Sequence, residues 1–309
     1  MIKYTLVRLL QTLIVLVGVS LVTFVMVNVV PGDPVALMME KRADPETMAR
    51  VRKEMGLDKP LTVQYLTLAK NALRGDFGTS YFARKPVGEM LLKGFKVTSV
   101  IGGMVILFSS FWGILLGVSA AVARGKPADK IIMFFSTLGM AAPSFWIAIL
   151  LQIVFGLKLM WFPISGLRST DSYVLPILSL ALIYTASIAR LSRTNMLDAL
   201  NQDYIRTARA KGVSELKVNL KHGLKNAAVP IITYIGIQIK WALGGSVLIE
   251  TVFSINGLGK LMIDAVMTRD IPVIQGCTIY IAVVFVVANL IIDLLYGLLD
   301  PRVRVAKEA

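Results

Sequence analysis

Few side chains in this sequence could support catalysis or metal binding. The chain has one histidine, His222, and one cysteine, Cys277. A His-Glu-x-x-His zinc site, a cysteine metal site and a disulfide therefore cannot be built, and a Ser/His/Asp triad would depend on a histidine in a basic segment that we expect at the surface. Neither Gly-Lys pair, at 125–126 or at 259–260, belongs to the Gly-x-x-x-x-Gly-Lys-Ser/Thr loop that binds nucleotide phosphates. The sequence predicts no enzyme and no directly bound cofactor or metal.

The most informative residues form a basic stretch, Asp-Tyr-Ile-Arg-Thr-Ala-Arg-Ala-Lys-Gly, that ends at Gly212. Its first residue, Asp203, is the predicted N-cap of a short helix. Arg209 and Lys211 suit the negative end of that helix, and Gly212 predicts the left-handed residue that stops it. Ser214 is the predicted cap of a second helix. The stretch and the residues that follow it therefore predict a helical hairpin, with two helices joined by a turn at Gly212.

The second helix of this hairpin is predicted to be amphipathic. One stripe at four-residue spacing is apolar and a neighbouring face is basic; these positions are Leu216, Leu220 and Leu224, and Lys217, Lys221 and Lys225. Because such an element between membrane spans would expose its apolar stripe, we interpret the hairpin as a docking surface for a partner protein.

The elements that must position this hairpin are membrane spans. The chain has 309 residues, of which 56% are hydrophobic, and a mean hydropathy of +0.70, which excludes a soluble globular protein. Only helices satisfy the backbone across such long apolar runs. We therefore predict an all-α integral membrane protein with six transmembrane helices, in the charge-free runs 9–32, 97–123, 131–157, 172–189 and 271–292 and in the run 226–249, which Lys240 alone interrupts.

The basic residues set the predicted orientation. Lys and Arg are concentrated in the loops on the side of the N-terminus, while the short loops on the other side hold only Lys158, Arg168, Lys260 and Arg269, so both termini are expected in the cytosol. The first run is too long for a signal peptide core and ends in Pro-Gly-Asp-Pro at 31–34, so it is predicted to be an uncleaved span. The net charge of +14 is then a topology signal, and no nucleic-acid partner is expected.

Four regions follow from these spans. They are a first span at 1–32, an extracytoplasmic segment at 33–96, a core at 97–300 with a cytosolic loop at 194–225, and a cytosolic tail at 301–309. The outer segment is predicted to hold two short helices, the first capped by Asp44 and ended by Gly56, the second opened by Pro60. We expect a structured lid and not an independent domain, because so short a segment would have a marginal core.

Residues inside the spans have structural and functional interpretations. Gly113-x-x-x-Gly117 predicts close helix packing, and Pro143 and Pro176 predict static bends. Asp293 and Asp300 are expected to be the only acids at span depth or edge, paired with Arg302 or Arg304 and not forming a proton relay. Lys240 is too deep for easy snorkelling. Structural pairing and a functional role are both open for it.

Five motifs together resemble the permease subunits of the dipeptide/oligopeptide family of ABC importers, which also includes nickel and glutathione permeases. The similarity covers nearly the whole chain. Its markers are Pro-Gly-Asp-Pro at 31–34, Gly-Leu-Asp-Lys-Pro at 56–60 with Gln64-Tyr65, Gly-Asp-Phe-Gly at 75–78, the stretch 203–212, and Asp-Pro-Arg at 300–302.

The resemblance implies a mechanism. The hairpin would be the family's coupling helix, which docks on an ATPase, and its residues would be Asp203, Tyr204, Arg206, Thr207, Ala208, Arg209, Lys211 and Gly212. Arg206 stands where the family's general Glu-Ala-Ala-x-x-x-Gly pattern has its acid, so docking carries over but an acid-specific contact does not. ATP and magnesium would bind to the partners and not to this chain.

Further partners follow from the same resemblance. They are a homologous second permease, two ATPases, an external binding protein that delivers the solute, and the lipids of the cytoplasmic membrane. Peptides are the expected cargo, with nickel or glutathione as the alternative. A stand-alone secondary transporter, or less favoured still a membrane-embedded enzyme, is the competing class, and copurification with an ATPase distinguishes the permease from both.

Overall fold

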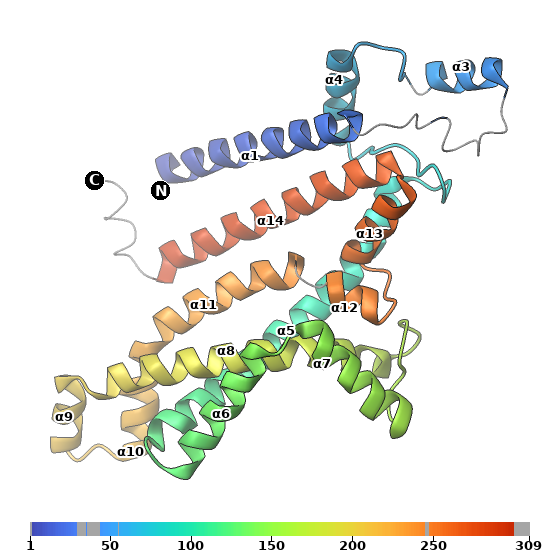
Figure 1. Ribbon diagram of the computed structural model, residues 1–309. Helices are drawn as coiled ribbons and strands as arrows, with labels where there is room; N and C mark the ends of the chain where they lie inside the picture. The colour runs from blue at the N-terminus through green and yellow to red at the C-terminus, as the bar shows by residue number, and fades with distance from the viewer. Residues whose placement is uncertain (1, 30–34, 36–43, 55, 245–246, 300–309) are drawn as a thin grey trace. The chain divides into compact units, whose positions relative to one another are not determined.

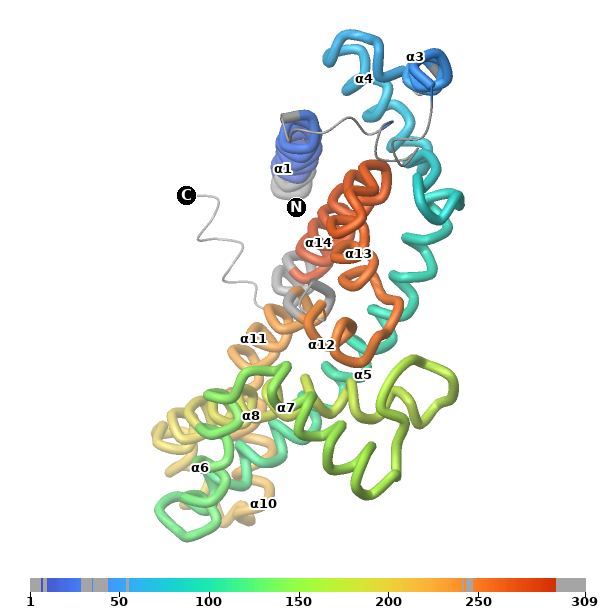
Figure 2. Tube along the Cα trace, turned by 45° about the vertical axis from the view of Figure 1, so that its right-hand side comes forward, coloured from blue at the N-terminus to red at the C-terminus, as the bar shows by residue number. Residues whose placement is uncertain are grey.

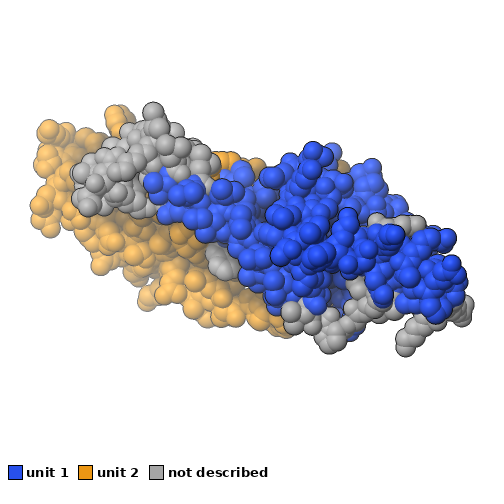
Figure 3. Space-filling view, turned by 90° about the horizontal axis from the view of Figure 1, so that it is seen from above, with its two compact units in different colours: residues 1–97, 256–287 blue, residues 98–255, 288–309 orange. Residues whose placement is uncertain are grey.

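The computed structural model describes residues 2–29, 35, 44–54, 56–244 and 247–299. It divides into two compact units, which Figure 3 colours separately: unit 1 holds residues 1–97 and 256–287, and unit 2 holds residues 98–255 and 288–309. The secondary structure of the described residues is helical, apart from an isolated bridge between Thr79 and Pro86. This agrees with the predicted fold class.

Unit 1 contains the first helices and part of the last one. These are α1 (Ile2–Val29), α3 (Pro45–Glu54), α4 (Leu61–Ala72), the start of α5 (Val87–Val122), α13 (Leu258–Thr268) and most of α14 (Ile271–Leu299) (Figure 1). The predicted signals of the outer segment are confirmed. An Asp44 carboxylate oxygen accepts the Thr47 N–H at 2.6 Å, Gly56 has φ of +67°, and Pro60 precedes α4.

The outer segment packs on the first span through one tyrosine. The Tyr65 hydroxyl lies 2.9 Å from the Ser20 hydroxyl, and its ring centroid lies 5.5 Å from that of Phe24. A second cluster, with Val87, Leu91 and Cys277 at its centre, joins α5, α13 and α14. The segment therefore packs on the helices of its own unit.

Unit 2 holds the remaining helices. They are α6 (Pro127–Ala141), α7 (Ser144–Leu151) with the π-helix η1 (Gln152–Lys158), the 3₁₀ turn η2 (Thr170–Tyr173), α8 (Val174–Leu200), α9 (Asp203–Ala210), α10 (Glu215–Lys217) with the π-helix η3 (Val218–Leu224), α11 (Lys225–Gly244) and α12 (Val247–Val252). Helix α8 contacts α6, α7 and α11, and α6 lies beside α8 in both views (Figures 1 and 2). It is the central helix of the unit.

Small residues bring α5 against α8. A Cβ on Gly113 would lie 2.7 Å from the Ile188 side chain, and one on Gly117 would lie 2.4 Å from the Ala189 carbonyl oxygen. Both distances are far inside van der Waals contact. The predicted packing role of this Gly-x-x-x-Gly pair is confirmed.

The third predicted span is broken and not merely bent. Helix α6 ends at Ala141, Pro143 occupies the N-cap of α7, and the two helical pieces meet at 105°. Proline removes a backbone donor and clashes with the preceding turn, so the chain restarts in a new direction. Pro176, in contrast, lies in the first turn of α8, where proline is tolerated.

Two helices extend beyond the apolar runs that predicted them. Helix α5 begins at Val87, ten residues before the apolar run at 97, because Glu89, Lys93 and Lys96 are compatible with a helix that extends beyond the hydrocarbon. Helix α8 continues to Leu200, so the first residues of the predicted cytosolic loop at 194–225 are helical.

Within the described part of the chain, four helical segments are long and apolar enough to cross a membrane: Leu10–Asn28, Val87–Val122, Thr170–Leu200 and Ile271–Ile292. A fifth crossing results if the bent pair of α6 and α7 with η1 is one broken span. The predicted features at 31–34, Asp300 and 301–309 lie outside the described residues, as does part of the loop between α11 and α12.

Candidate functional site

The predicted hairpin is present in unit 2, between α8 and α11. Helix α9 spans Asp203–Ala210, and Gly212 follows it with φ of +75°, which confirms the left-handed stop. The prediction that Asp203 caps the helix was wrong: Gln202 holds the N-cap position and Asp203 is the first helical residue. Its carboxylate instead lies 3.5 Å from the Arg206 guanidinium, because a side chain inside the first turn faces the residue three positions on.

The hairpin has a small core of its own. Ile205 and Ala208 on α9 are buried against Val218 at the start of η3, and the Val213 N–H donates to the Ala208 carbonyl at 3.2 Å. Ala208 is thus part of the internal packing, so it can shape a docking surface but not line it. Ile205 was not among the predicted residues, although its apolar side chain within a basic stretch is a signal for such an anchor.

An ion pair closes the turn between the two helices. Nε of Arg209 donates to Glu215 at 2.8 Å and the second guanidinium nitrogen donates to its other oxygen at 3.2 Å. This contact lowers the pKa of Glu215 and raises that of Arg209. Arg209 therefore stabilises the hairpin internally, in addition to favouring the end of α9.

The outer surface of the hairpin carries the remaining predicted residues. Tyr204 is 40% exposed, Leu216 is 69% exposed and Leu220 is 49% exposed. Cations surround these apolar groups, since Arg206, Lys211 and Lys217 are also exposed. An aromatic and two leucines held open on a folded element can bind a complementary protein surface.

The predicted leucine stripe is only partly correct. Helix α10 is a single turn, and residues 218–224 form a π-helix. A π-helix bonds residue i to i+5 and so has a wider turn, in which side chains four apart no longer align. Leu216 and Leu220 stay exposed, whereas Leu224 packs toward Met196 and Ala227.

Lys240 lies on α11 and is partly buried. On the same helix Gln238 is buried and its amide donates to the Ser187 hydroxyl of α8 at 3.1 Å. Ala242, also buried, approaches Gly102 of α5. Lys240 lies two positions from both Gln238 and Ala242, and two positions correspond to about 200° around a helix. Lys240 therefore faces away from the side of α11 that packs on α5 and α8. The structure does not bring it near the hairpin.

Sequence reasoning missed a buried acid. Glu250 on α12 has no exposed surface, and it accepts the Thr98 hydroxyl of α5 at 2.7 Å. The expectation that Asp293 and Asp300 are the only acids at the spans was therefore wrong. Glu250 directly follows the apolar run 226–249, and a charge at that boundary is the signal that was available. Among the described residues, no group of three or more His, Cys, Asp or Glu could hold a metal.

Solved structures share this arrangement of helices. A chain of the MetNI methionine ABC transporter in an inward-facing conformation matches with a TM-score of 0.56, covering 68% of this chain and 96% of that one at 16% identity. A chain of an amino acid ABC transporter, solved with histidines, matches with a TM-score of 0.54, covering 67% and 93% at 16% identity. This chain therefore shares its fold with the matched chains of these two ABC transporters.

The sequence identifies the family. Residues 113–305 match the family described as "Binding-protein-dependent transport system inner membrane component", and residues 1–102 match its N-terminal counterpart, "Binding-prot-dependent transport system membrane comp, N-term". The chain belongs to this family of binding-protein-dependent inner-membrane permeases. It is a membrane permease subunit of an ABC importer.

Curated relatives match over almost their full length. The chain is 40% identical over 304 residues to the glutathione transport system permease protein GsiC of Salmonella choleraesuis strain SC-B67, covering 98% of this chain and 99% of that one. It is 39% identical over 304 residues to the GsiC protein of Escherichia coli strain K12, with the same coverage. This confirms the family that the sequence motifs indicated.

Proposed function

We propose that this permease imports small peptides, glutathione included, and that the hairpin of α9, α10 and η3 docks on the ATPase that drives it. One observation carries the proposal: Tyr204, Leu216 and Leu220 are exposed on an element that its own core and ion pair already hold in shape. A preorganised apolar surface loses little conformational entropy when a partner covers it.

The rest of the complex follows from this role. The partners are two ATPases that bind ATP and magnesium, a homologous second permease that completes the path, and an external binding protein that delivers the solute to the outer segment, 33–96. This chain itself binds no nucleotide and catalyses no hydrolysis. Movement of the ATPases would shift α9, and the spans would carry that shift to the path.

The proposed topology has six spans and both termini in the cytosol. It counts α6 with α7 and η1 as one broken span and adds α11, in which Lys240 is the charge inside the apolar run. This arrangement places the basic hairpin on the cytosolic side, in agreement with the distribution of Lys and Arg.

Glutathione is a tripeptide, so the name of the GsiC relatives and the peptide expectation describe one class of cargo. Nickel is the alternative within the family. Uptake of labelled glutathione, a dipeptide and nickel by cells that express the complete transporter decides between them. Nickel uptake alone would overturn the peptide assignment.

Lys240 is the proposed residue on the translocation path. It points away from the α5 and α8 side of α11, so its ammonium group is available to a solute carboxylate or to the second permease. In a Cys277→Ser background, Lys240→Cys should react with a water-soluble maleimide in one access state. A cysteine that stays unlabelled in both the resting and the ATP-trapped complex, with transport by Lys240→Met unchanged, would remove it from the path.

The docking role is tested at Gly212. A Cβ there would meet nothing within 4 Å, so only the left-handed backbone restricts the residue. Gly212→Val forces a β-branched residue to positive φ at a cost of about 1–3 kcal/mol, while Gly212→Asn tolerates this conformation. We expect the Val variant to lose ATPase association and the Asn variant to keep it. Normal association and solute-stimulated turnover in both would refute the assignment.

A further inference from the structure

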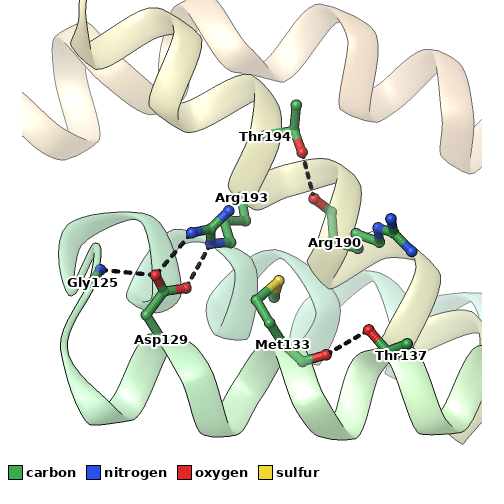
Figure 4. A network of polar contacts seen from close by, with 7 residues as sticks. All are labelled: Gly125, Asp129, Met133, Thr137, Arg190, Arg193 and Thr194. Carbon is green, nitrogen blue, oxygen red and sulfur yellow. Dashed lines mark hydrogen bonds and ion pairs between the residues drawn. The ribbon is translucent and has the colours of Figure 1, made fainter.

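Two helices and a turn meet at one buried carboxylate. Asp129, in the first turn of α6, is 4% exposed. Its Oδ1 accepts Nε of Arg193 at 2.6 Å, and its Oδ2 accepts a terminal guanidinium nitrogen of Arg193 at 2.8 Å (Figure 4). Oδ2 also accepts the backbone N–H of Gly125 at 2.9 Å. One side chain thus connects the turn after α5, the start of α6 and the second half of α8.

The pair fixes orientation as well as distance. A planar guanidinium that meets a carboxylate through two parallel hydrogen bonds resists rotation, which a single lysine contact does not. Separation would leave a buried charge without its partner, so the two groups stay together. Arg190, one turn earlier on α8, is exposed, and its side chain points away from Asp129 (Figure 4).

Close packing continues from this ion pair along both neighbours of α8. A Cβ on Gly139 of α6 would lie 3.1 Å from the Ala186 Cβ, and a Cβ on Gly117 of α5 would lie 3.0 Å from the backbone nitrogen of Arg193. Helix α6 is therefore held to α8 at two levels, by charge near its start and by small residues near its end. Helix α5 reaches the same point of α8.

This joint lies directly before the hairpin in the chain. Helix α8 runs without a break to Leu200, and only residues 201–202 separate it from α9. Arg193 precedes Asp203 by ten positions. Along the chain, a displacement of α9 is therefore passed back into α8, which carries Arg193, while η3 contacts α9, α8 and α11.

We propose that Asp129 and Arg193 are positioning residues for transport: their ion pair makes the first turn of α6 and the turn at Gly125 follow α8 when the ATPase moves α9. The inference rests on the proposed docking role of the hairpin. The pair lies outside the proposed docking surface formed by Tyr204, Leu216 and Leu220. It converts movement of one helix into movement of a block of α5, α6 and α8.

The test measures coupling and not activity alone. Asp129→Asn keeps an acceptor for the Gly125 N–H but removes the negative charge. Arg193→Lys keeps the positive charge but removes the pair of parallel guanidinium hydrogen bonds. Each is reconstituted in proteoliposomes with the ATPases and the binding protein. We expect ATPase association and basal hydrolysis to stay within about twofold of wild type and glutathione imported per ATP to fall about tenfold. Arg190→Gln is the matched control and should leave that ratio unchanged.

If hydrolysis and import fell in proportion, the ion pair would only stabilise the fold, and the proposal would be overturned. Glutathione imported per ATP that stays at the wild-type value would overturn it as well. A wild-type chain that fails to bind the ATPase would refute the docking role instead, so the two failures are distinguishable.

A disulfide provides a second measurement that leaves the ion pair intact. The variant combines Gly139→Cys and Ala186→Cys in a Cys277→Ser background. A Cβ at position 139 would lie 3.1 Å from the Ala186 Cβ, and disulfides need a Cβ–Cβ distance of about 3.5 Å or more. A small shift of the two helices therefore allows the bond to form. If α6 and α8 move as one block, oxidation should leave import per ATP unchanged. Import that stops on oxidation and returns on reduction would overturn the proposal. This measurement decides even if neither ion-pair variant assembles.

Discussion

Asp270 shows how one carboxylate organises an outer loop. It is 3% exposed, and it accepts the Ser80 hydroxyl at 2.5 Å and the backbone N–H groups of Tyr81 and Phe82 at 3.2 and 3.4 Å. The turn that follows includes Arg84 at φ of +52°. Left-handed backbone at a non-glycine residue persists only where neighbours determine it, and Asp270 supplies that constraint.

Replacing this acceptor should loosen the loop. Asp270→Asn replaces one acceptor oxygen with an NH₂ group, which is a donor and faces the hydroxyl and N–H donors of the loop. We therefore expect the free energy of unfolding to fall by about 1–3 kcal/mol. Thermal unfolding of the detergent-solubilised chain measures it. Asp264→Asn, which breaks the exposed pair with Lys260 on α13, is the matched control and should have little effect. Equal transitions for both variants would contradict the role of Asp270.

The hairpin ion pair has a defined pH window. Its partner Arg209 lowers the pKa of Glu215 below the usual value of 4.5. A lowered pKa stabilises the folded hairpin above the unfolded value and loses that effect as the pH falls through the folded value. Because the pair is exposed, we expect only a modest weakening of ATPase association under acid conditions. Glu215→Gln should show the weaker association at every pH. A wild-type acid dependence that persists in this variant would contradict the assignment.

At the residue scale, local signals were reliable where one residue type suffices. Gly212 and Gly56 were predictable because few other residues adopt a positive φ without strain. Asp129, Glu250 and Asp270 were not, because their partners are distant in sequence: Thr98 and Glu250 are 152 positions apart. A charge beside an apolar run shows no partner until the fold brings one to it.

Helices α5 and α8 approach closely only because glycine is present at two positions. Gly117→Ala would place a Cβ 2.4 Å from a backbone oxygen of α8, and a backbone atom cannot move aside as the end of a side chain can. We expect a cost of about 1–3 kcal/mol from overpacking, together with reduced import. Gly103→Ala on the same helix meets nothing within 4 Å and should be neutral or slightly stabilising. Equal unfolding temperatures for the two would contradict this packing.

At the element scale, apolar runs located helices but not their internal geometry. The run 131–157 predicted one span, whereas α6 and α7 meet at 105°. Hydropathy cannot separate a bend from a break, since both leave the composition unchanged. The π-helical turn at 218–224 had no visible sequence signal either, and it redirected Leu224 into the packing beside Met196.

For the whole molecule, the proposed topology predicts which loops face each compartment. In a Cys277→Ser background, a cysteine at Lys126 should be protected from a membrane-impermeant maleimide in intact cells, because the loop after α5 is assigned to the cytosol. A cysteine at Gly166 should be labelled, because the loop after η1 is assigned to the outside. Lys126 is exposed and Gly166 is partly exposed. Whether the maleimide reaches each cysteine therefore depends on the compartment that the loop faces. The reverse pattern would invert the orientation.

The whole-molecule class was predictable from composition and motifs, and the match over 98% of the chain confirms it. The hairpin was predictable as an element because caps and charges are local. Its internal core was not, because burial of Ala208 depends on Val218 folding back over it. Hydropathy and the resemblance to the family thus indicated the class of protein, while three-dimensional packing decides which residues remain available to partners.

The sparse burial of α1 bears on biogenesis. In its apolar part, Leu10–Asn28, only 6% of the residues are buried in the chain. A segment with so few helix contacts gains little from the rest of its own polypeptide, and its backbone hydrogen bonds are satisfied within the helix itself. It can leave the translocon while later spans are still on the ribosome. Tyr65 then reaches back to Ser20 and Phe24, so the nascent outer segment settles on a helix that is already inserted.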